Sequence, residues 1–214
     1  MAPVAFVGDI HGDAVRLERL LEQSAGWKRR LVFLGDYVNR GPDSSRVLEL
    51  VVSAVEGGHV ALLGNHDHAF LQYLEGRLAF AELAAMGGAS TIRSYVAEPH
   101  GDVLASLLHV LPAHHITLLR GLRPYWETDS ILASHVGYDP ANRGGRSLDD
   151  VALRGHSSIF YDPDPPLKLV VCGHYTQELG RPYVTSRLVC LDTGCGSQGP
   201  LSALLWPELQ VVQF

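Results

Sequence analysis

Three short apolar runs in the first third of the chain each end in a glycine followed by an acid or an amide, and a helix-like segment follows each run. The apolar runs cover residues 3–7, 31–34 and 59–63, and the helix-like segments cover 13–21, 44–55 and 67–74. Strand–helix units repeated in this way predict a mostly parallel sheet covered by helices. Asp13 is a suitable N-cap for the first helix, and Ser44 or Ser45 for the second.

The rest of the chain changes from helical to strand-rich character near residue 121. Helical segments are expected at 79–86, 89–96, 103–110 and 114–119, with breaks at 87–88, Pro99 and Pro112. A hairpin is expected at 124–127 and 130–135, and further strands at 167–172, 187–191, 201–206 and 210–214. The 214 residues show no repeat or linker, so we expect a single domain over residues 1–214.

The composition argues against several classes of protein. Hydrophobic residues make up 46% of the chain, which is enough for a substantial core and argues against disorder. The formal net charge of −6 argues against a nucleic-acid groove, since such domains are usually basic. The 3 cysteines give no disulfide framework and are expected to be reduced thiols. The N-terminal stretch lacks the regions of a signal peptide, so we expect a cytoplasmic protein without membrane association.

Five of the apolar runs end in polar clusters that could come together in space. The side chains in these clusters that can bind a cation are Asp9, His11, Asp36, Asn65, His135 and His174. In open α/β sheets, sites form just beyond the carboxyl ends of the strands. Carboxylates mixed with neutral imidazoles suit a transition metal such as Mn, Fe or Zn, whereas Mg and Ca disfavour imidazole. Six ligands are too many for one tetrahedral ion and fit two ions that share a bridging carboxylate.

The same clusters carry a resemblance to a known family. The motifs are GDIHG at 8–12, GDYVNRG at 35–41, GNHD at 64–67, His135 and the GH pair at 173–174. This set resembles the calcineurin-like metallophosphoesterases, and within them the phosphoprotein phosphatase branch that includes the bacterial diadenosine tetraphosphate hydrolases. The resemblance implies an α/β fold, a four-layer α-β-β-α sandwich in which two mixed sheets are flanked by helices. It covers about residues 4–206, nearly the whole chain.

The resemblance also implies roles for the residues of these motifs. The metal ligands would be Asp9 and His11 at one ion, Asp36 bridging both ions, and Asn65, His135 and His174 at the second. The cofactors would be two divalent transition-metal ions, with Mn²⁺ favoured and Fe, Co, Zn or Ni as alternatives. His66 would protonate the leaving group, and it would contact the phosphate together with Asn65. Arg40 would bind the phosphate bidentately, and Arg154 is our choice for a second phosphate-binding arginine.

Asn39 departs from the pattern of the protein serine/threonine phosphatases, which have Asp at this position and usually Glu where this chain has Asp67. The neutral residue and the Asp together resemble the diadenosine tetraphosphate hydrolases. A carboxylate beside His66 would raise the pKa of its imidazole, whereas an amide orients the ring without supplying charge. A weaker acid suits a leaving group that is already a stable anion, because general acid catalysis typically contributes 10²–10⁴-fold.

The favoured function is therefore hydrolysis of the phosphoanhydride bonds of dinucleoside polyphosphates by a metal-bridging hydroxide, with a symmetric cut and with aryl phosphates as side substrates. The alternative is a bacterial protein serine/threonine phosphatase acting on a phosphoprotein. A non-catalytic nucleotide sensor is a distant alternative, since it would carry a non-coordinating residue at some ligand position and none of the six does. We expect no nucleic-acid partner, and a monomer or a small homo-oligomer.

Overall fold

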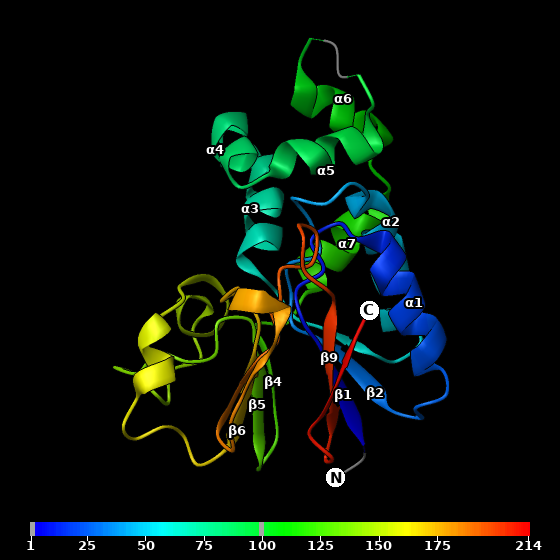
Figure 1. The fold of residues 1–214 in the computed structure, drawn as a ribbon. Coiled ribbons are helices and arrows are strands. Elements are labelled where there is room, and N and C mark those ends of the chain that lie inside the picture. Colours follow the sequence, from blue (N-terminus) through cyan, green and yellow to red (C-terminus); the bar gives the residue numbers. More distant parts are fainter. Residues whose placement is uncertain (1–2, 99–100) are drawn as a thin grey trace.

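Ten strands form two five-stranded sheets in the computed structural model, which describes residues 3–98 and 101–214 (Figure 1). The first sheet has the order β10-β9-β1-β2-β3. Its strands are β1 (Val4–Val7), β2 (Arg30–Phe33), β3 (Val60–Ala61), β9 (Ser202–Trp206) and β10 (Gln210–Gln213). β1, β2 and β3 are parallel, and β9 pairs antiparallel with both β1 and β10. The predicted parallel arrangement of the first third is confirmed.

The second sheet has the order β4-β5-β6-β8-β7 and is also mixed. Its strands are β4 (Tyr125–Glu127), β5 (Ile131–Ser134), β6 (Leu169–Cys172), β7 (Tyr183–Val184) and β8 (Leu188–Cys190). β4 and β5 form the predicted hairpin, and β5, β6 and β8 run parallel. β7 is a two-residue strand that the sequence pattern did not predict, because so short a segment has no periodicity.

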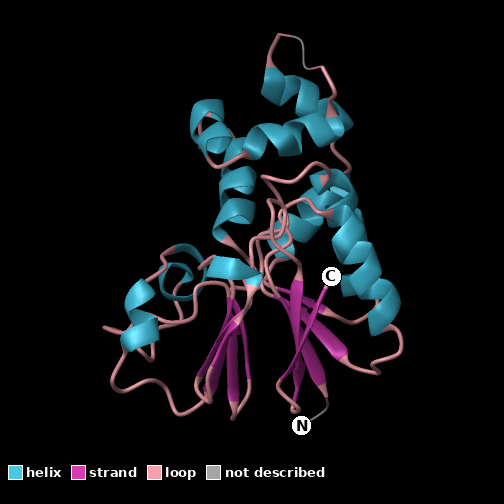
Figure 2. Cartoon of the chain, viewed as in Figure 1, coloured by secondary structure: helices cyan, strands magenta, loops and turns pink. Residues whose placement is uncertain are grey.

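The two sheets pack face to face around a shared apolar core (Figure 2). Phe6 and Val32 from the first sheet lie in one cluster with Ile131 and Val171 from the second, and all four are fully buried. Strands buried on both faces read as continuous apolar runs. This burial explains why the strand segments were recognisable in the sequence.

Helices cover the outer face of the first sheet and extend above the ends of its strands (Figure 1). They are α1 (Ala14–Ser24), α2 (Ser44–Glu56), α3 (Asn65–Leu74), α4 (Phe80–Ala85), α5 (Gly88–Tyr95), α6 (Val103–Val110) and α7 (Ala113–Gly121). Asp13 caps α1 as predicted, since its carboxylate accepts a hydrogen bond from the N–H of Arg16. The cap of α2 is Asp43 rather than Ser44 or Ser45, because the Asp43 carboxylate reaches the N–H of Arg46. The break expected at Pro99 lies outside the described residues.

The outer face of the second sheet packs against a 3-10 turn at Ser157–Tyr161, whose Ile159 lies in one cluster with Leu132, Val170 and Cys172. A π turn at Asp149–Leu153 contacts α3, and a 3-10 turn at Glu178–Gly180 accepts a hydrogen bond from Gln213 of β10. The fourth layer of the expected sandwich is therefore present but irregular. In the described residues, no single helix is long and apolar enough to cross a membrane, and the pair α6–α7, which meets that criterion only jointly, is bent by 99°.

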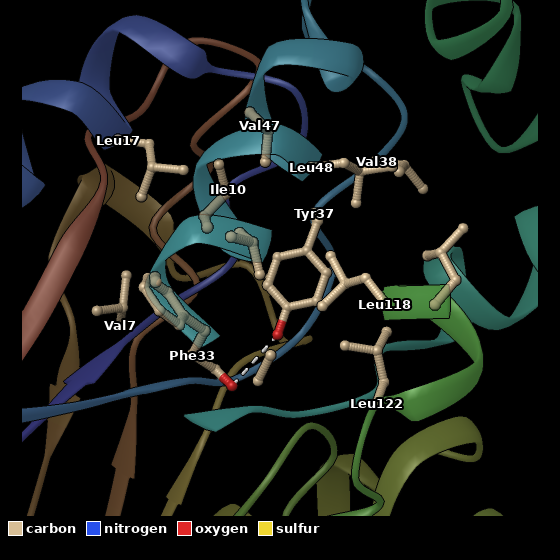
Figure 3. Close-up of a cluster of buried hydrophobic side chains, with 14 of the residues drawn as sticks. Val7, Ile10, Leu17, Phe33, Tyr37, Val38, Val47, Leu48, Leu118 and Leu122 are labelled. Carbon is tan, nitrogen blue, oxygen red and sulfur yellow. Dashed lines mark hydrogen bonds between the residues drawn. The ribbon is translucent and has the colours of Figure 1, made fainter. Parts of the chain in front are cut away.

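Tyr37 anchors the loop after β2 to the core between the first sheet and its helices (Figure 3). Its ring is fully buried, and its hydroxyl donates a hydrogen bond to the carbonyl of Leu62 at 2.8 Å. Val47 of α2 and Leu118 of α7 belong to the same cluster. The loop that starts at Gly35 is thus held firmly at its centre, and this fixes the polar residues on either side of Tyr37.

Candidate metal centre and active site

The polar clusters predicted from the sequence meet at one edge of the two sheets. Asp9 and His11 follow β1, Asp36 follows β2, and His135 follows β5. Asn65 begins α3, which starts two residues earlier than the sequence pattern indicated. The loops carrying these residues converge between the strand ends and the helices above them (Figure 2). Both sheets therefore contribute to one site.

The backbone at this site is unusual. Among the described residues, eight non-glycine residues have a positive φ, and five of them are site candidates. These five are His11, Asp36, Asn39, Arg40 and His174. Such conformations cost of order 1–3 kcal/mol each and persist only where the surrounding structure imposes them. The loops therefore adopt strained backbone conformations that hold these side chains in position.

The unprotonated Nε2 of His11 faces carboxylate oxygens. Its Nδ1 lies 2.9 Å from the carbonyl oxygen of Val38, so Nδ1 must carry the proton and donate it. Nε2 then has a lone pair and no proton. It lies 3.4 Å from Asp36 Oδ2 and 3.9 Å from Asp9 Oδ2. Within the described residues it is the one buried side-chain nitrogen or oxygen without a hydrogen-bond partner. A lone pair facing two carboxylates fits a bound cation.

The same argument applies to His135 on the other side of Asp36. Its Nδ1 donates to the carbonyl oxygen of Leu34 at 3.0 Å, which leaves Nε2 unprotonated. That Nε2 lies 3.0 Å from Asn65 Oδ1 and 3.5 Å from Asp36 Oδ1, and both of these oxygens are acceptors. Nδ1 of His174 also lies 3.0 Å from Asn65 Oδ1. This group of atoms, like the one around His11, could hold a cation, and Asp36 contributes an oxygen to both groups.

Burial and charge at the site favour metal binding. Burial, together with the carboxylates of Asp192 and Asp36, raises the pKa of Asp9 well above its usual range. Burial first, and then the charge of Arg40, lowers the pKa of His11. Burial and His174 likewise lower the pKa of His135. Neutral imidazoles are the form that coordinates metals, and buried carboxylates need a compensating positive charge.

Two glycines allow the carboxylates to lie close to the backbone. A Cβ at Gly173 would lie 1.9 Å from Asp9 Oδ1, and one at Gly64 would lie 2.2 Å from Asp36 Oδ1. Asp9 instead accepts hydrogen bonds from the N–H of His174 at 3.1–3.2 Å. Any side chain at either glycine would displace a candidate metal ligand.

Asn39 contacts His66 as the sequence analysis required. Asn39 Nδ2 lies 2.9 Å from His66 Nδ1, and the fully buried Thr91 of α5 fixes the amide on its other side. The Thr91 hydroxyl donates to Asn39 Oδ1 at 3.0 Å and accepts from the Asn39 N–H at 2.8 Å. With Oδ1 engaged by Thr91, Nδ2 donates to His66 Nδ1, and the proton of the neutral ring resides on Nε2. Burial, followed by the charge of Arg40, lowers the pKa of His66 to about 3.

The two candidate phosphate-binding arginines differ in how the structure places them. Arg40 is exposed at the site, and its Nη2 lies 3.4 Å from His66 Nε2, which is a contact and not a hydrogen bond when Nε2 carries the ring proton. Arg154 is also exposed and lies beside Gly155, where a Cβ would be 2.5 Å from His174 Nε2. Gly155, the chain neighbour of Arg154, therefore lies against His174, whereas the Arg40 side chain itself lies against His66.

Asp67 and Asp192 support the site in ways that the sequence analysis did not predict. The buried Asp67 carboxylate accepts hydrogen bonds from the N–H groups of Asp36, Tyr37 and Gly64 at 2.7–3.1 Å, and so ties two site loops together. Burial raises its pKa to about 7, and these amide donors oppose that rise. Asp192 accepts from the Thr176 hydroxyl at 2.7 Å and holds the loop after His174. In the sequence, Asp67 ends the GNHD motif and Asp192 lies outside the five motifs, and neither position specifies a contact.

Two packed mixed sheets with a buried cluster of Asp and His at their strand ends define a metallophosphoesterase. The model of the calcineurin-like phosphoesterase family matches residues 2–177, and the chain belongs to this family. It is accordingly a hydrolase, and the family implies divalent metal ions at the cluster.

Individual relatives and solved structures show which members of the family this chain resembles. Over 98% of this chain and 92% of the relative, the sequence is 26% identical to the bis(5′-nucleosyl)-tetraphosphatase PrpE of Halalkalibacterium halodurans, which is named as asymmetrical. The PrpE of Geobacillus sp. strain WCH70 is 25% identical with the same coverage. A structure described as a candidate diadenosine tetraphosphatase has a TM-score of 0.65 at 24% identity, covering 100% of this chain and 93% of that one. A protein serine/threonine phosphatase from Saccharomyces cerevisiae has a TM-score of 0.60 at 13% identity, covering 100% and 79%. These structural matches show the fold alone.

Proposed function

We propose that this chain hydrolyses the phosphoanhydride bonds of dinucleoside polyphosphates, with two divalent metal ions, Mn²⁺ favoured, as cofactors. The observation that carries the proposal is the contact between Asn39 and His66, in which an amide stands where a protein phosphatase would have a carboxylate. The names of the PrpE relatives support the same substrate class.

The proposed ligands are Asp9, His11 and Asp36 for one ion, and Asp36, Asn65, His135 and His174 for the other. When bound, such ions supply Lewis acidity toward phosphate oxygens and lower the pKa of water so that it becomes a nucleophile. The chain itself supplies the ligand positions, which are held by carbonyl contacts to His11 and His135 and by the N–H groups that orient Asp9 and Asp36.

His66 acts on the leaving group through Nε2. Because Asn39 donates to Nδ1, the Nε2–H of the neutral ring can donate a hydrogen bond to the departing oxygen. Full transfer of a proton would require an imidazolium, and an amide brings no negative charge to stabilise one. A nucleoside polyphosphate leaves as a stable anion and needs only the hydrogen bond, whereas a seryl alkoxide needs the proton. The site therefore favours anhydrides over phosphoserine.

Arg40, with Arg154 as a second candidate, binds the phosphates. Arg40 is exposed beside His66, so its guanidinium can reach a phosphate that spans the metal centre. A dinucleoside polyphosphate carries several phosphates in a row. One arginine on each side of the site suits such a chain, and the asymmetrical cleavage named for the relatives favours an asymmetric cut over the symmetric one expected from the sequence.

The test is to change Asn39→Asp and to compare two substrates in Mn²⁺, diadenosine tetraphosphate and a phosphoserine peptide. Turnover of the peptide should rise by about tenfold or more relative to turnover of the dinucleotide. Equal changes for both substrates would refute the leaving-group argument. They would mean that the Asn39 amide orients His66 well enough for the hydrolysis of any ester. Product analysis distinguishes ATP plus AMP from two ADP.

The alternative is a protein serine/threonine phosphatase, a class that shares this fold. It predicts that the unmodified enzyme already cleaves the phosphopeptide faster than the dinucleotide. A non-catalytic nucleotide sensor predicts binding of the dinucleotide without turnover in any metal. The same two assays therefore separate all three functions.

A further inference from the structure

Three metal-ligating side chains meet at the contact between α2 and α7, and none of them belongs to the strand-end loops. Glu49 of α2 faces two adjacent histidines of α7, His114 and His115. Glu49 Oε2 lies 2.7 Å from His114 Nε2 and 3.1 Å from His115 Nε2. One ligand atom from each residue lies within 4.8 Å of the others. Residues 65 positions apart are thus brought together at one point.

We propose that Glu49, His114 and His115 form a third metal site, separate from the dinuclear centre, that binds a divalent transition-metal ion such as Zn²⁺. Two imidazoles and one carboxylate are a donor set that favours Zn, Co or Ni over Mg or Ca. Three protein ligands leave a fourth tetrahedral position open, which water can fill.

The geometry needs little adjustment to hold an ion. Bonds of about 2.0–2.2 Å in a tetrahedron place ligand atoms roughly 3.3 Å apart. The present separations of 2.7 and 3.1 Å are slightly shorter, because the three groups hydrogen-bond to one another. Glu49 and His114 can move apart, since their side chains are 46% and 50% exposed, whereas His115 is 2% exposed and fixed. The exposed side also gives an ion a path of entry.

The Tyr95 hydroxyl contacts His115 on Nδ1, the ring nitrogen that does not face Glu49. The Tyr95 hydroxyl of α5 lies 2.7 Å from His115 Nδ1, with the two rings packed edge to face. When Nε2 binds a metal, Nδ1 carries the proton and can donate it to the Tyr95 oxygen, the arrangement that usually orients a ligating histidine. Burial lowers the pKa of His115, and hydrogen bonds from His114 and His115 lower the pKa of Glu49, which favours a neutral imidazole at His115 and a carboxylate at Glu49.

An ion at this point would link three helices, α2, α7 and, through Tyr95, α5, that lie near the loop carrying Asn39. Glu49 lies on α2, the histidines lie on α7, and Tyr95 ends α5. α5 also carries Thr91, which holds Asn39 and lies 3.1 Å from Ser44 at the start of α2. The third metal would therefore stabilise the frame behind Asn39 without touching the substrate.

The test compares the zinc content and thermal stability of the whole chain with those of Glu49→Gln and His114→Ala, with His109→Ala, an exposed histidine of α6, as the matched control. After zinc loading and desalting, each of the two site variants should retain one zinc ion fewer than the unmodified chain, and their affinity for the third ion should fall by at least about tenfold. The rise in Tm that zinc produces, measured against the melting of the same protein in chelator, should be smaller in these variants, while their Mn²⁺-dependent hydrolysis stays unchanged.

With Co²⁺ as the probe, the unmodified chain and His109→Ala should show the absorption of a tetrahedral ion, and both site variants should lose that component. Equal metal content and equal Co²⁺ spectra in all four proteins would overturn the proposal. So would a loss of zinc in His109→Ala as large as that in His114→Ala, because it would show binding by any surface histidine.

Discussion

Replacement of Thr91 by valine should test whether the buried hydroxyl sets the orientation of the Asn39 amide. Valine keeps the shape of the side chain and removes one oxygen. That oxygen accepts from the Asn39 N–H at 2.8 Å, donates to Asn39 Oδ1 at 3.0 Å and lies 3.1 Å from Ser44 Oγ. All three residues are fully buried, so no bulk water replaces the lost partner.

The expected cost follows from the groups left without partners. A buried donor or acceptor that loses its hydrogen bond costs about 1–3 kcal/mol. We take about 2 kcal/mol for Thr91→Val, which corresponds to a fall in Tm of about 4–8 °C for a domain of this size. The freed amide of Asn39 can also rotate away from His66 Nδ1. Turnover of diadenosine tetraphosphate should then fall by on the order of tenfold, because a poorly oriented catalytic group loses most of its effect.

The assays are thermal unfolding and steady-state hydrolysis in Mn²⁺. Thr91→Ser keeps the hydroxyl and should recover most of the turnover. Thr117→Val is the matched control, since it removes a hydroxyl from an exposed helical position and should leave Tm and turnover nearly unchanged. If Thr91→Val were as stable and as active as Thr91→Ser, the idea that this hydroxyl positions Asn39 would be wrong.

Three further outcomes are expected. Gly173→Ala should lose bound metal while remaining folded, because its Cβ would lie 1.9 Å from Asp9 Oδ1, whereas Gly144→Ala, which has open space, should keep it; elemental analysis compares them. Arg40→Lys should lower kcat/KM by about tenfold or more at unchanged metal content, since lysine cannot bind phosphate bidentately. Glu127 has its pKa lowered by hydrogen bonds from an arginine and then a lysine. Its carboxylate therefore stabilises the fold above its unfolded pKa of about 4.3 and loses this effect as the pH falls through the lower folded pKa. In denaturation measured at a series of pH values, the free energy of unfolding of Glu127→Gln should fall less steeply below pH about 4.3 than that of the unmodified chain. An equally steep fall would contradict the stabilising role of the Glu127 carboxylate.

The strands and the candidate ligands were predictable because both are local features of the sequence. An apolar run such as 31–34 reads as a buried strand, and the polar residue at its end, Asp36, must then lie at the edge of the sheet. The cap of α2 was misplaced by one residue, since Asp43, Ser44 and Ser45 are all good caps and only the backbone geometry selects one.

The supporting residues were not predictable, because each acts over a long separation in the chain. Thr91 contacts Asn39 across 52 positions, and Glu49 contacts His115 across 66. Nothing in the sequence near His115 shows the facing carboxylate. Such contacts depend on how helices pack, which periodicity does not specify.

The pairing of β1 has a consequence for how the chain is made. Val4 lies opposite Arg30 on one side and opposite Trp206 on the other. On the ribosome, Trp206 emerges 176 residues after Arg30, which is roughly 10–35 s later at typical synthesis rates. Until then one edge of the strand that precedes Asp9 is open to any passing strand. Newborn chains should thus need protection by a chaperone, and a protein truncated before β9 should aggregate instead of accumulating as a partly active enzyme.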